Sequence, residues 1–146
     1  MSRSNLAALT PGTVIATRDH TADEIDLFLF SAACSLPHRI HYDAEFAQSE
    51  GLKTVPVHGP LQATWLTQLA AEWAAQNGAD LATSTVRHQS SAYPHERLQA
   101  SLVVVGVEPN PSDSGLEVVL DLSLTKEDGT VTTAGTAHVR LNNGDK

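Results

Sequence analysis

Residues 59–78 have the sequence GPLQATWLTQLAAEWAAQNG, and this stretch decides the fold. A proline in the first turn and a glycine just past the last turn are the residues that typically begin and end a helix. Large apolar residues recur between them at every fourth position, with alanines on either side, so apolar side chains cover more than half of the circumference. Such a helix is largely buried. The four large residues are Leu61, Trp65, Leu69 and Trp73.

The chain after Ala79 has the pattern of β-strands. Its segments alternate or run apolar with β-branched residues, and turn-forming residues separate them at 108–111 and, as a hairpin signal, at 127–129. One buried helix followed by such strands predicts an α+β fold, a single domain over 1–146 in which an antiparallel sheet wraps around the helix. The predicted strands are 81–88, 98–107, 116–124 and 130–141.

Shorter elements are predicted before the long helix. A strand at 14–17 follows a turn, and Thr21 with Glu24 fits a capping box that begins a helix at 22–33. Ile25, Phe28 and Leu29 recur at helical spacing within that segment. A further helix of one or two turns is predicted at 43–48.

Composition excludes several classes of protein. The chain has 146 residues, of which 41% are hydrophobic, and a formal net charge of −8. That balance argues against nucleic-acid and anionic-membrane binding. A single cysteine excludes an intrachain disulfide and zinc sites built on two or more cysteines. No segment approaches the ~18 apolar residues of a membrane span, and MSRSNLAALTPG lacks the apolar run of a signal peptide. We expect a cytoplasmic protein with no metal site.

The segment 37–43, PHRIHYD, has the highest density of reactive side chains. It is predicted to be a loop between two helical pieces, and loops on a rigid scaffold often carry catalysis. Histidine can give or take a proton near neutral pH. The alternative is that Asp43 caps the next helix and His41 forms only local hydrogen bonds. Spacing alone leaves both open, and Asp43 is a cap under either interpretation.

The segment 57–60, VHGP, stands where the long helix begins. The first N–H groups of a helix have no partner within it and lie at the positive end of its dipole. Pro60 has no N–H, so the donors are Gly59 and then Leu61 onward. Glycine lets a carbonyl oxygen approach the backbone closely, which favours an oxyanion hole. The alternative is an ordinary helix start with a structural His58.

Together, HRIHYD at 38–43 and HGPLQAT at 58–64 resemble the MaoC-like hydratases and dehydratases, in particular the itaconyl-CoA/mesaconyl-CoA hydratase-like branch. The resemblance extends over nearly the whole chain. It implies a hotdog fold, in which a curved antiparallel sheet surrounds a long helix, assembled as a homodimer or as a heterodimer with another hotdog subunit. It also implies acyl-CoA substrates, reversible addition of water to a 2,3-double bond, and no cofactor besides the coenzyme A of the substrate.

The resemblance also assigns roles to residues. His41 matches the family's catalytic histidine, and Gly59 matches the glycine whose N–H binds the thioester carbonyl. We hypothesise that His38 and His41 form the acid/base pair, while Arg39 or Arg87 meets a carboxylate or a CoA phosphate. The full set of predicted substrate-binding residues is Arg39, Tyr42, His58, Leu61 and Arg87.

Leu36 departs from the family pattern. Typical members carry aspartate five residues before the catalytic histidine, and the closer branch often carries asparagine. Three outcomes are open: His38 assists His41, the chain is a weakened or non-catalytic partner of a second hotdog subunit, or the pocket serves other thioester chemistry. A thioesterase would need a carboxylate near the start of the long helix, and neither Asp43 nor Glu72 is well positioned for that.

Three histidines outside these motifs have no obvious partner in the sequence. They fall in predicted strands or turns, and the neighbouring Ser90 and Ser91 form no recognisable catalytic triad with them. We therefore assign them no role. They are His88, His95 and His138.

Overall fold

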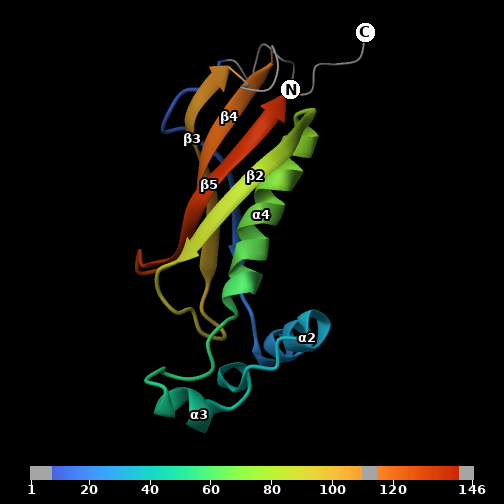
Figure 1. Ribbon diagram of the computed structural model, residues 1–146. Coiled ribbons are helices and arrows are strands. Elements are labelled where there is room, and N and C mark those ends of the chain that lie inside the picture. The colour runs from blue at the N-terminus through green and yellow to red at the C-terminus, as the bar shows by residue number, and fades with distance from the viewer. Residues whose placement is uncertain (1–7, 110–114, 142–146) are drawn as a thin grey trace.

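The computed structural model describes residues 8–109 and 115–141. Within them, one antiparallel sheet has the strand order β1-β3-β4-β5-β2 (Figure 1). The predicted α+β fold is confirmed. The strands are β1 (Val14–His20), β2 (Ala79–His88), β3 (Leu98–Pro109), β4 (Leu116–Lys126) and β5 (Val131–Leu141). The helices are α2 (Glu24–Cys34), the 3-10 helix η1 (Arg39–His41), α3 (Ala44–Ser49) and α4 (Gly59–Gln76).

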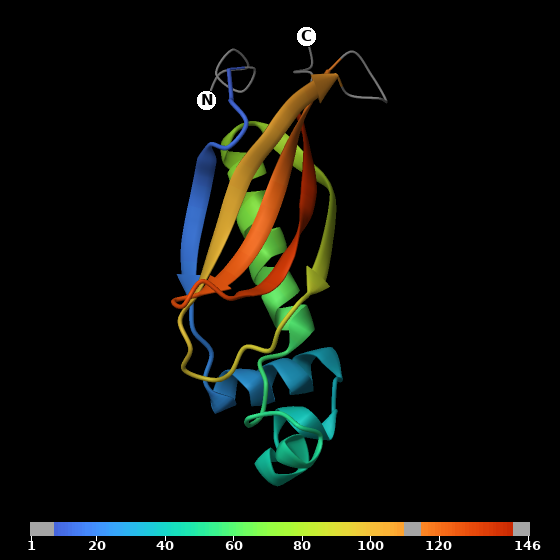
Figure 2. The same cartoon turned by 90° about the vertical axis from the view of Figure 1, so that its left-hand side faces the viewer.

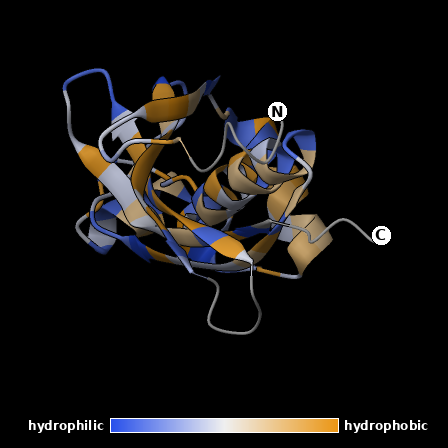
Figure 3. Cartoon of the chain, turned by 90° about the horizontal axis from the view of Figure 1, so that it is seen from above, coloured by the Kyte–Doolittle hydropathy of each residue, from blue (hydrophilic) through white to orange (hydrophobic). Residues whose placement is uncertain are grey.

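Helix α4 lies along one face of the sheet (Figures 2 and 3). Its buried side chains include Leu66, Leu69 and Trp73, whereas Trp65 is only partly buried and stacks on His20. They pack against inward-facing residues of the central strands, because alternate residues of a strand share one face. On β3 these are Leu98, Ala100, Leu102 and Val104, and on β4 they are Val118, Leu120, Leu122 and Leu124.

The sheet curves because its ladders are irregular. The register shifts between Val104 and Gly106 on β3 and between Leu81 and Thr83 on β2. A β-bulge adds a residue to one strand and increases its bend and twist. The curved sheet can therefore contact α4 along its length.

The segment between β1 and α4, residues 21–58, forms a separate layer at the N-terminal end of α4. Helices α2 and α3 of this segment lie below the sheet (Figure 1). The predicted capping box at Thr21 is wrong. The cap is Asp23, whose side chain accepts from the Asp26 N–H, while the Asp26 side chain accepts from the Asp23 N–H. Both tetrapeptides fit the capping pattern, and the chain uses the later one. Asp43 caps α3 as predicted.

Helix α2 exposes most of its apolar residues. Leu27 is its buried side chain, whereas Ile25, Phe28 and Leu29 are exposed. The spacing of those three residues predicted the helix but not the face that is buried.

Strands β1 to β4 extend the predicted ranges by two or three residues, whereas β5 begins one residue later than predicted. The hairpin at 127–129 is confirmed. The turn predicted at 108–111 differs, since β3 continues to Pro109, and residues 110 and 111 lie outside the described part of the chain. Within residues 8–109 and 115–141, no helix combines the length and apolar composition that crossing a bilayer requires.

Candidate active site

A groove of about 520 Å³ lies where α4 begins. Its lining includes His41 from η1, Gly59 from the first turn of α4, and His88 from the end of β2. The two motifs singled out in the sequence therefore meet at one cavity. The third residue comes from outside both motifs.

The His41 imidazole is held by one of its two nitrogens. Its Nδ1 lies 2.9 Å from the carbonyl oxygen of Pro56. A carbonyl only accepts, so Nδ1 carries the proton, and the neutral ring has its lone pair on Nε2. Burial lowers the pKa of His41, and nearby His38 lowers it further, while the bond to Pro56 opposes this shift. His41 can therefore accept a proton at neutral pH.

The buried ring of His58 packs against the ring of His41. Their rings stack with centroids 3.7 Å apart, and His58 is 0% exposed. The Nε2 atom of His58 is hydrogen-bonded to Ser31 Oγ at 2.8 Å, whereas its buried Nδ1 has no partner. Burial lowers the pKa of His58 to about 4, with repulsion from His41 as the second cause. His58 is thus a neutral platform that keeps the catalytic candidate in place.

This arrangement predicts that the folded chain loses stability in mild acid. The pKa of His58 is near 6.5 in the unfolded chain and about 4 in the folded one. Between these two pH values the unfolded chain binds a proton at His58 and the folded chain does not. The free energy of unfolding is therefore highest above pH 6.5 and decreases as the pH falls toward 4. The loss from this residue alone is roughly 3 kcal/mol. Urea titrations at several pH values check it. The variant His58→Gln should lose less stability over this range, and parallel curves for the two proteins would contradict the assignment.

The start of α4 offers an unpaired donor. Gly59 is the first residue of the helix, and its N–H has no acceptor among the described residues. The preceding backbone is fixed because the Val57 N–H donates to the Ala92 carbonyl at 2.8 Å. An N–H at this position can bind a developing oxyanion.

His88 has partners that the sequence analysis missed. Its Nδ1 lies 3.0 Å from Thr133 Oγ1, and the Thr133 hydroxyl donates to Gln62 Oε1 at 3.1 Å. The two other histidines without an assigned role also have partners: His95 pairs with Glu24, and His138 with Glu117. The partners of these three histidines are therefore visible in the structure although none is obvious in the sequence. Each contact joins segments that are distant in the sequence.

The remaining predicted site residues are spread around the groove. The ring of His38 lies 6.3 Å from that of His41, and its Nδ1 accepts from the Ile40 N–H. Arg39 pairs with Asp43 at 2.8 Å. The others lie apart. Tyr42 lines a separate hollow with Phe28 and Pro37, Leu61 packs against the core, and Arg87 lines a pocket between β2 and β5.

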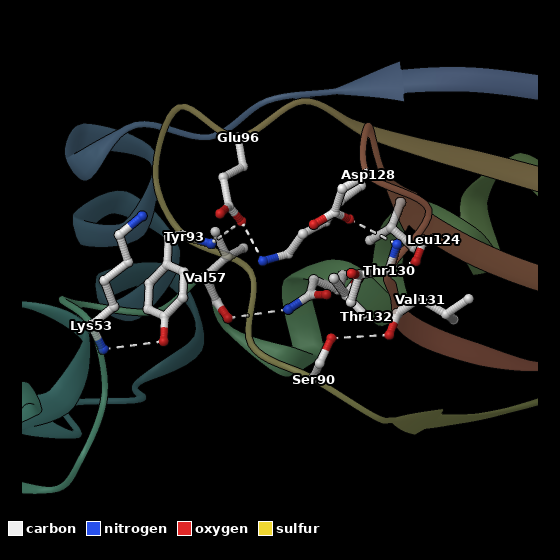
Figure 4. Close-up of polar contacts among 12 residues, drawn as sticks. Lys53, Val57, Ser90, Tyr93, Glu96, Leu124, Asp128, Thr130, Val131 and Thr132 are labelled. Carbon is white, nitrogen blue, oxygen red and sulfur yellow. Dashed lines mark hydrogen bonds and ion pairs between the residues drawn. The ribbon is translucent and has the colours of Figure 1, made fainter.

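The loop at 89–97, of which residues 89–91 line the groove, is fixed at several points (Figure 4). Ser90 donates to the Val131 carbonyl, and the Tyr93 hydroxyl accepts from the Lys53 N–H. Glu96 pairs with Lys126 at 2.8 Å. The β4–β5 hairpin therefore holds this wall of the groove.

A sequence comparison assigns the family. The model of a family described as hydroxyacyl-thioester dehydratase type 2 matches residues 3–94, well over half of the chain. The chain belongs to this family. Membership confirms the predicted resemblance to MaoC-like hydratases and dehydratases.

A curated relative and solved structures are similar to this dehydratase family member. Mesaconyl-C(4)-CoA hydratase of Chloroflexus aurantiacus is 49% identical over 55 residues, which are 37% of this chain and 20% of the relative. The match thus spans only a fifth of the curated relative. A MaoC-like dehydratase from Rhodospirillum rubrum superposes with a TM-score of 0.79 at 19% identity, covering 94% of this chain and 96% of that one.

The ChsH1-ChsH2 complex from Mycobacterium tuberculosis gives a TM-score of 0.75 at 16% identity, covering 91% of this chain and 98% of the other. These structural likenesses confirm the hotdog fold. Among the described residues of this dehydratase family member, no group of three or more His, Cys, Asp or Glu side chains is arranged to hold a metal ion.

Proposed function

We propose that the chain catalyses the reversible addition of water to the 2,3-double bond of an acyl-CoA thioester. One observation carries the proposal: a base and an oxyanion donor border the same groove. His41 offers an unprotonated Nε2, and Gly59 offers an unpaired N–H. Hydration needs both, because water must lose a proton as it attacks and the thioester oxygen gains negative charge.

The proposed reaction begins with water between His41 and the substrate. His41 Nε2 takes a proton from water while the water oxygen bonds to C3. The π electrons move toward C2 and the thioester oxygen, which the Gly59 N–H stabilises. A proton then adds to C2, and dehydration follows the same steps in reverse. No step in this scheme uses a metal or redox cofactor, and coenzyme A enters only as part of the substrate.

A short dicarboxylic acyl group is the proposed substrate class. The 55-residue match to a mesaconyl-C(4)-CoA hydratase supports it. The loop that lines the groove contributes Gln89, Ser90 and Ser91, whose polar side chains suit an acyl chain that ends in a carboxylate.

We further propose that the chain works beside a second hotdog subunit, either a copy of itself or a homologue. Ile25, Phe28, Leu29 and Tyr42 expose apolar surface at one end of the molecule, which a partner would bury. Strand β2 is an edge of the sheet, and such an edge is often covered by another chain.

Leu36 supports a second candidate function, that of a non-catalytic subunit. Neither Leu36 nor any Asp or Glu is among the described residues that line the groove. The same observation disfavours a thioesterase that uses a carboxylate. Asp43 is engaged by Arg39 and the Phe46 N–H, and Glu72 by Arg18 at 2.6 Å.

A spectrophotometric assay tests the proposal. The purified chain is mixed with crotonyl-, mesaconyl- and a longer trans-2-enoyl-CoA, and loss of the conjugated thioester absorbance is followed. A thiol reagent in parallel detects hydrolysis to free CoA. Hydration with no thiol release supports the proposed function. No turnover by the chain alone, together with turnover after a copurifying hotdog partner is added, favours the non-catalytic role.

A further inference from the structure

We propose that His88 is the second proton-transfer group of the groove, the one that delivers a proton to C2 during hydration. This inference rests on the proposed function and deepens it. Hydration involves two proton transfers, and His41 accounts for one. Leu36 has an aliphatic side chain that cannot exchange a proton, and it is not among the described residues that line the groove.

A chain of hydrogen bonds fixes which nitrogen of His88 is engaged and which is open to the groove. Gln62 Nε2 donates to the Val57 carbonyl at 3.2 Å, which leaves Gln62 Oε1 as an acceptor. Thr133 donates its only hydroxyl proton to that oxygen at 3.1 Å. The Thr133 oxygen must therefore accept from His88 Nδ1, 3.0 Å away. His88 keeps a proton on Nδ1, and Nε2 is the nitrogen that can accept and donate a proton.

The open nitrogen of His88, Nε2, lies beside the residue that carries the oxyanion donor. A Cβ atom added to Gly59 would stand 2.7 Å from His88 Nε2, so the ring packs against the Cα of that glycine. His41 is arranged in the same way, with Nδ1 bonded to a protein oxygen and Nε2 without a partner. Two imidazoles thus border the groove near one backbone N–H.

The other residues that line the groove offer no further acid or base. Among the groove-lining residues in the described part of the chain, the imidazole side chains are those of His41 and His88, and no Asp, Glu, Lys or Arg is among them. Arg87, the neighbour of His88 on β2, lines a different pocket. The elements packed against His88, α4 and β5, contribute the uncharged Gln62 and Thr133.

The step balances with one neutral and one protonated imidazole. Neutral His41 takes a proton from water, whose oxygen bonds to C3 of the enoyl thioester. The π electron pair of the double bond forms the new C2–H bond, and the proton of that bond comes from Nε2 of the His88 imidazolium. Solvent then returns the extra proton from His41 to His88, and the net change is addition of one water molecule.

The variant His88→Asn tests the inference, because the asparagine amide can still donate to Thr133 but has no titrating nitrogen. We expect kcat to fall about a hundredfold with KM changed less than about threefold. The wild-type kcat should fall at both acidic and alkaline pH, since it needs His41 neutral and His88 protonated. The variant should lose the alkaline decline. The matched control is His95→Asn, at an exposed histidine with φ of 66°, a conformation that asparagine tolerates.

Thr133 is a positioning residue in this scheme, and a pair of variants tests its role separately. Thr133→Val removes the acceptor of His88 and should lower kcat about tenfold, whereas Thr133→Ser keeps the hydroxyl and should restore it. Circular dichroism and thermal melting of each variant monitor folding, so a loss caused by unfolding is recognised directly.

The outcomes separate this inference from the proposed function. If His88→Asn keeps the wild-type kcat and pH profile while replacement of His41 removes turnover, the role of His88 is overturned and the hydratase stands. If the wild-type chain hydrates no thioester in the panel, alone or with a partner, both fail. The hundredfold loss, together with the missing alkaline decline, supports both.

Discussion

Replacing His41 with alanine should lower the rate of thioester hydration by about a thousandfold or more. The variant removes the atom that accepts the proton of water, whereas the Gly59 N–H and the rest of the groove remain. We therefore expect kcat to account for this decrease, with KM little changed. The measurement is the spectrophotometric hydration assay on whichever enoyl-CoA the wild-type chain converts.

The pH dependence of the wild-type chain gives a second view of the same residue. Burial lowers the pKa of His41, and a base must be unprotonated to act. The activity of the wild-type chain should consequently persist on mild acidification, to a lower pH than an exposed histidine would allow, before it falls.

Two comparison variants make the His41 result specific. His95→Ala removes an exposed histidine that is paired with Glu24, and it should retain full activity. His38→Ala tests the alternative in which His38, and not His88, is the partner of His41, and a loss as large as that of His41→Ala would favour that alternative. Retention of turnover by His41→Ala would refute the assignment of the base.

Replacing Gly135 with alanine should destabilise the fold by about 3 kcal/mol, a loss at the upper end of those caused by overpacking. Gly135 lies on β5 opposite Val86 of β2. A Cβ there would overlap the Thr85 carbonyl oxygen and stand 2.8 Å from Val86 Cα. These are backbone atoms, so relief requires that β2 move away from β5. Thermal unfolding should occur about 10 °C lower than in the wild-type chain.

The control for that prediction is another glycine of the same sheet. Gly106 on β3 has nothing within 4 Å of the position a Cβ would take. Gly106→Ala should leave stability unchanged or raise it by up to about 1 kcal/mol, because alanine restricts the unfolded chain. Equal stability of both variants in urea titrations would disprove the close approach of β2 and β5 at Gly135.

The sequence predicts the parts of this molecule that follow local rules. The long helix is recognisable because its apolar residues repeat every four positions, and the strands because β-branched residues alternate between turns. His41 and Gly59 are each marked by unusual neighbours within a few positions. Their meeting at one groove follows from the family resemblance and is observed in the structure.

Other features escape prediction because their causes are not local. His88 is bonded to a threonine 45 residues away, and no pattern within β2 reveals that partner. The burial of His58 depends on α2 and η1 folding back over the start of α4. The N-cap of α2 fails for a different reason, since Thr21 and Asp23 both satisfy the same local pattern and only the three-dimensional fit selects between them.

The order of strands has a consequence for the growing polypeptide on the ribosome. Among residues 8–109 and 115–141, β5 is the strand that pairs with β2, yet β3 and β4 are translated between them. A nascent chain that already contains His41, Gly59 and His88 therefore has an edge strand without its partner and lacks the hydroxyl that orients His88. Chains that stall or are cut before β5 lack Thr133, the hydrogen-bond partner of His88. They also expose an unpaired strand edge, which favours aggregation.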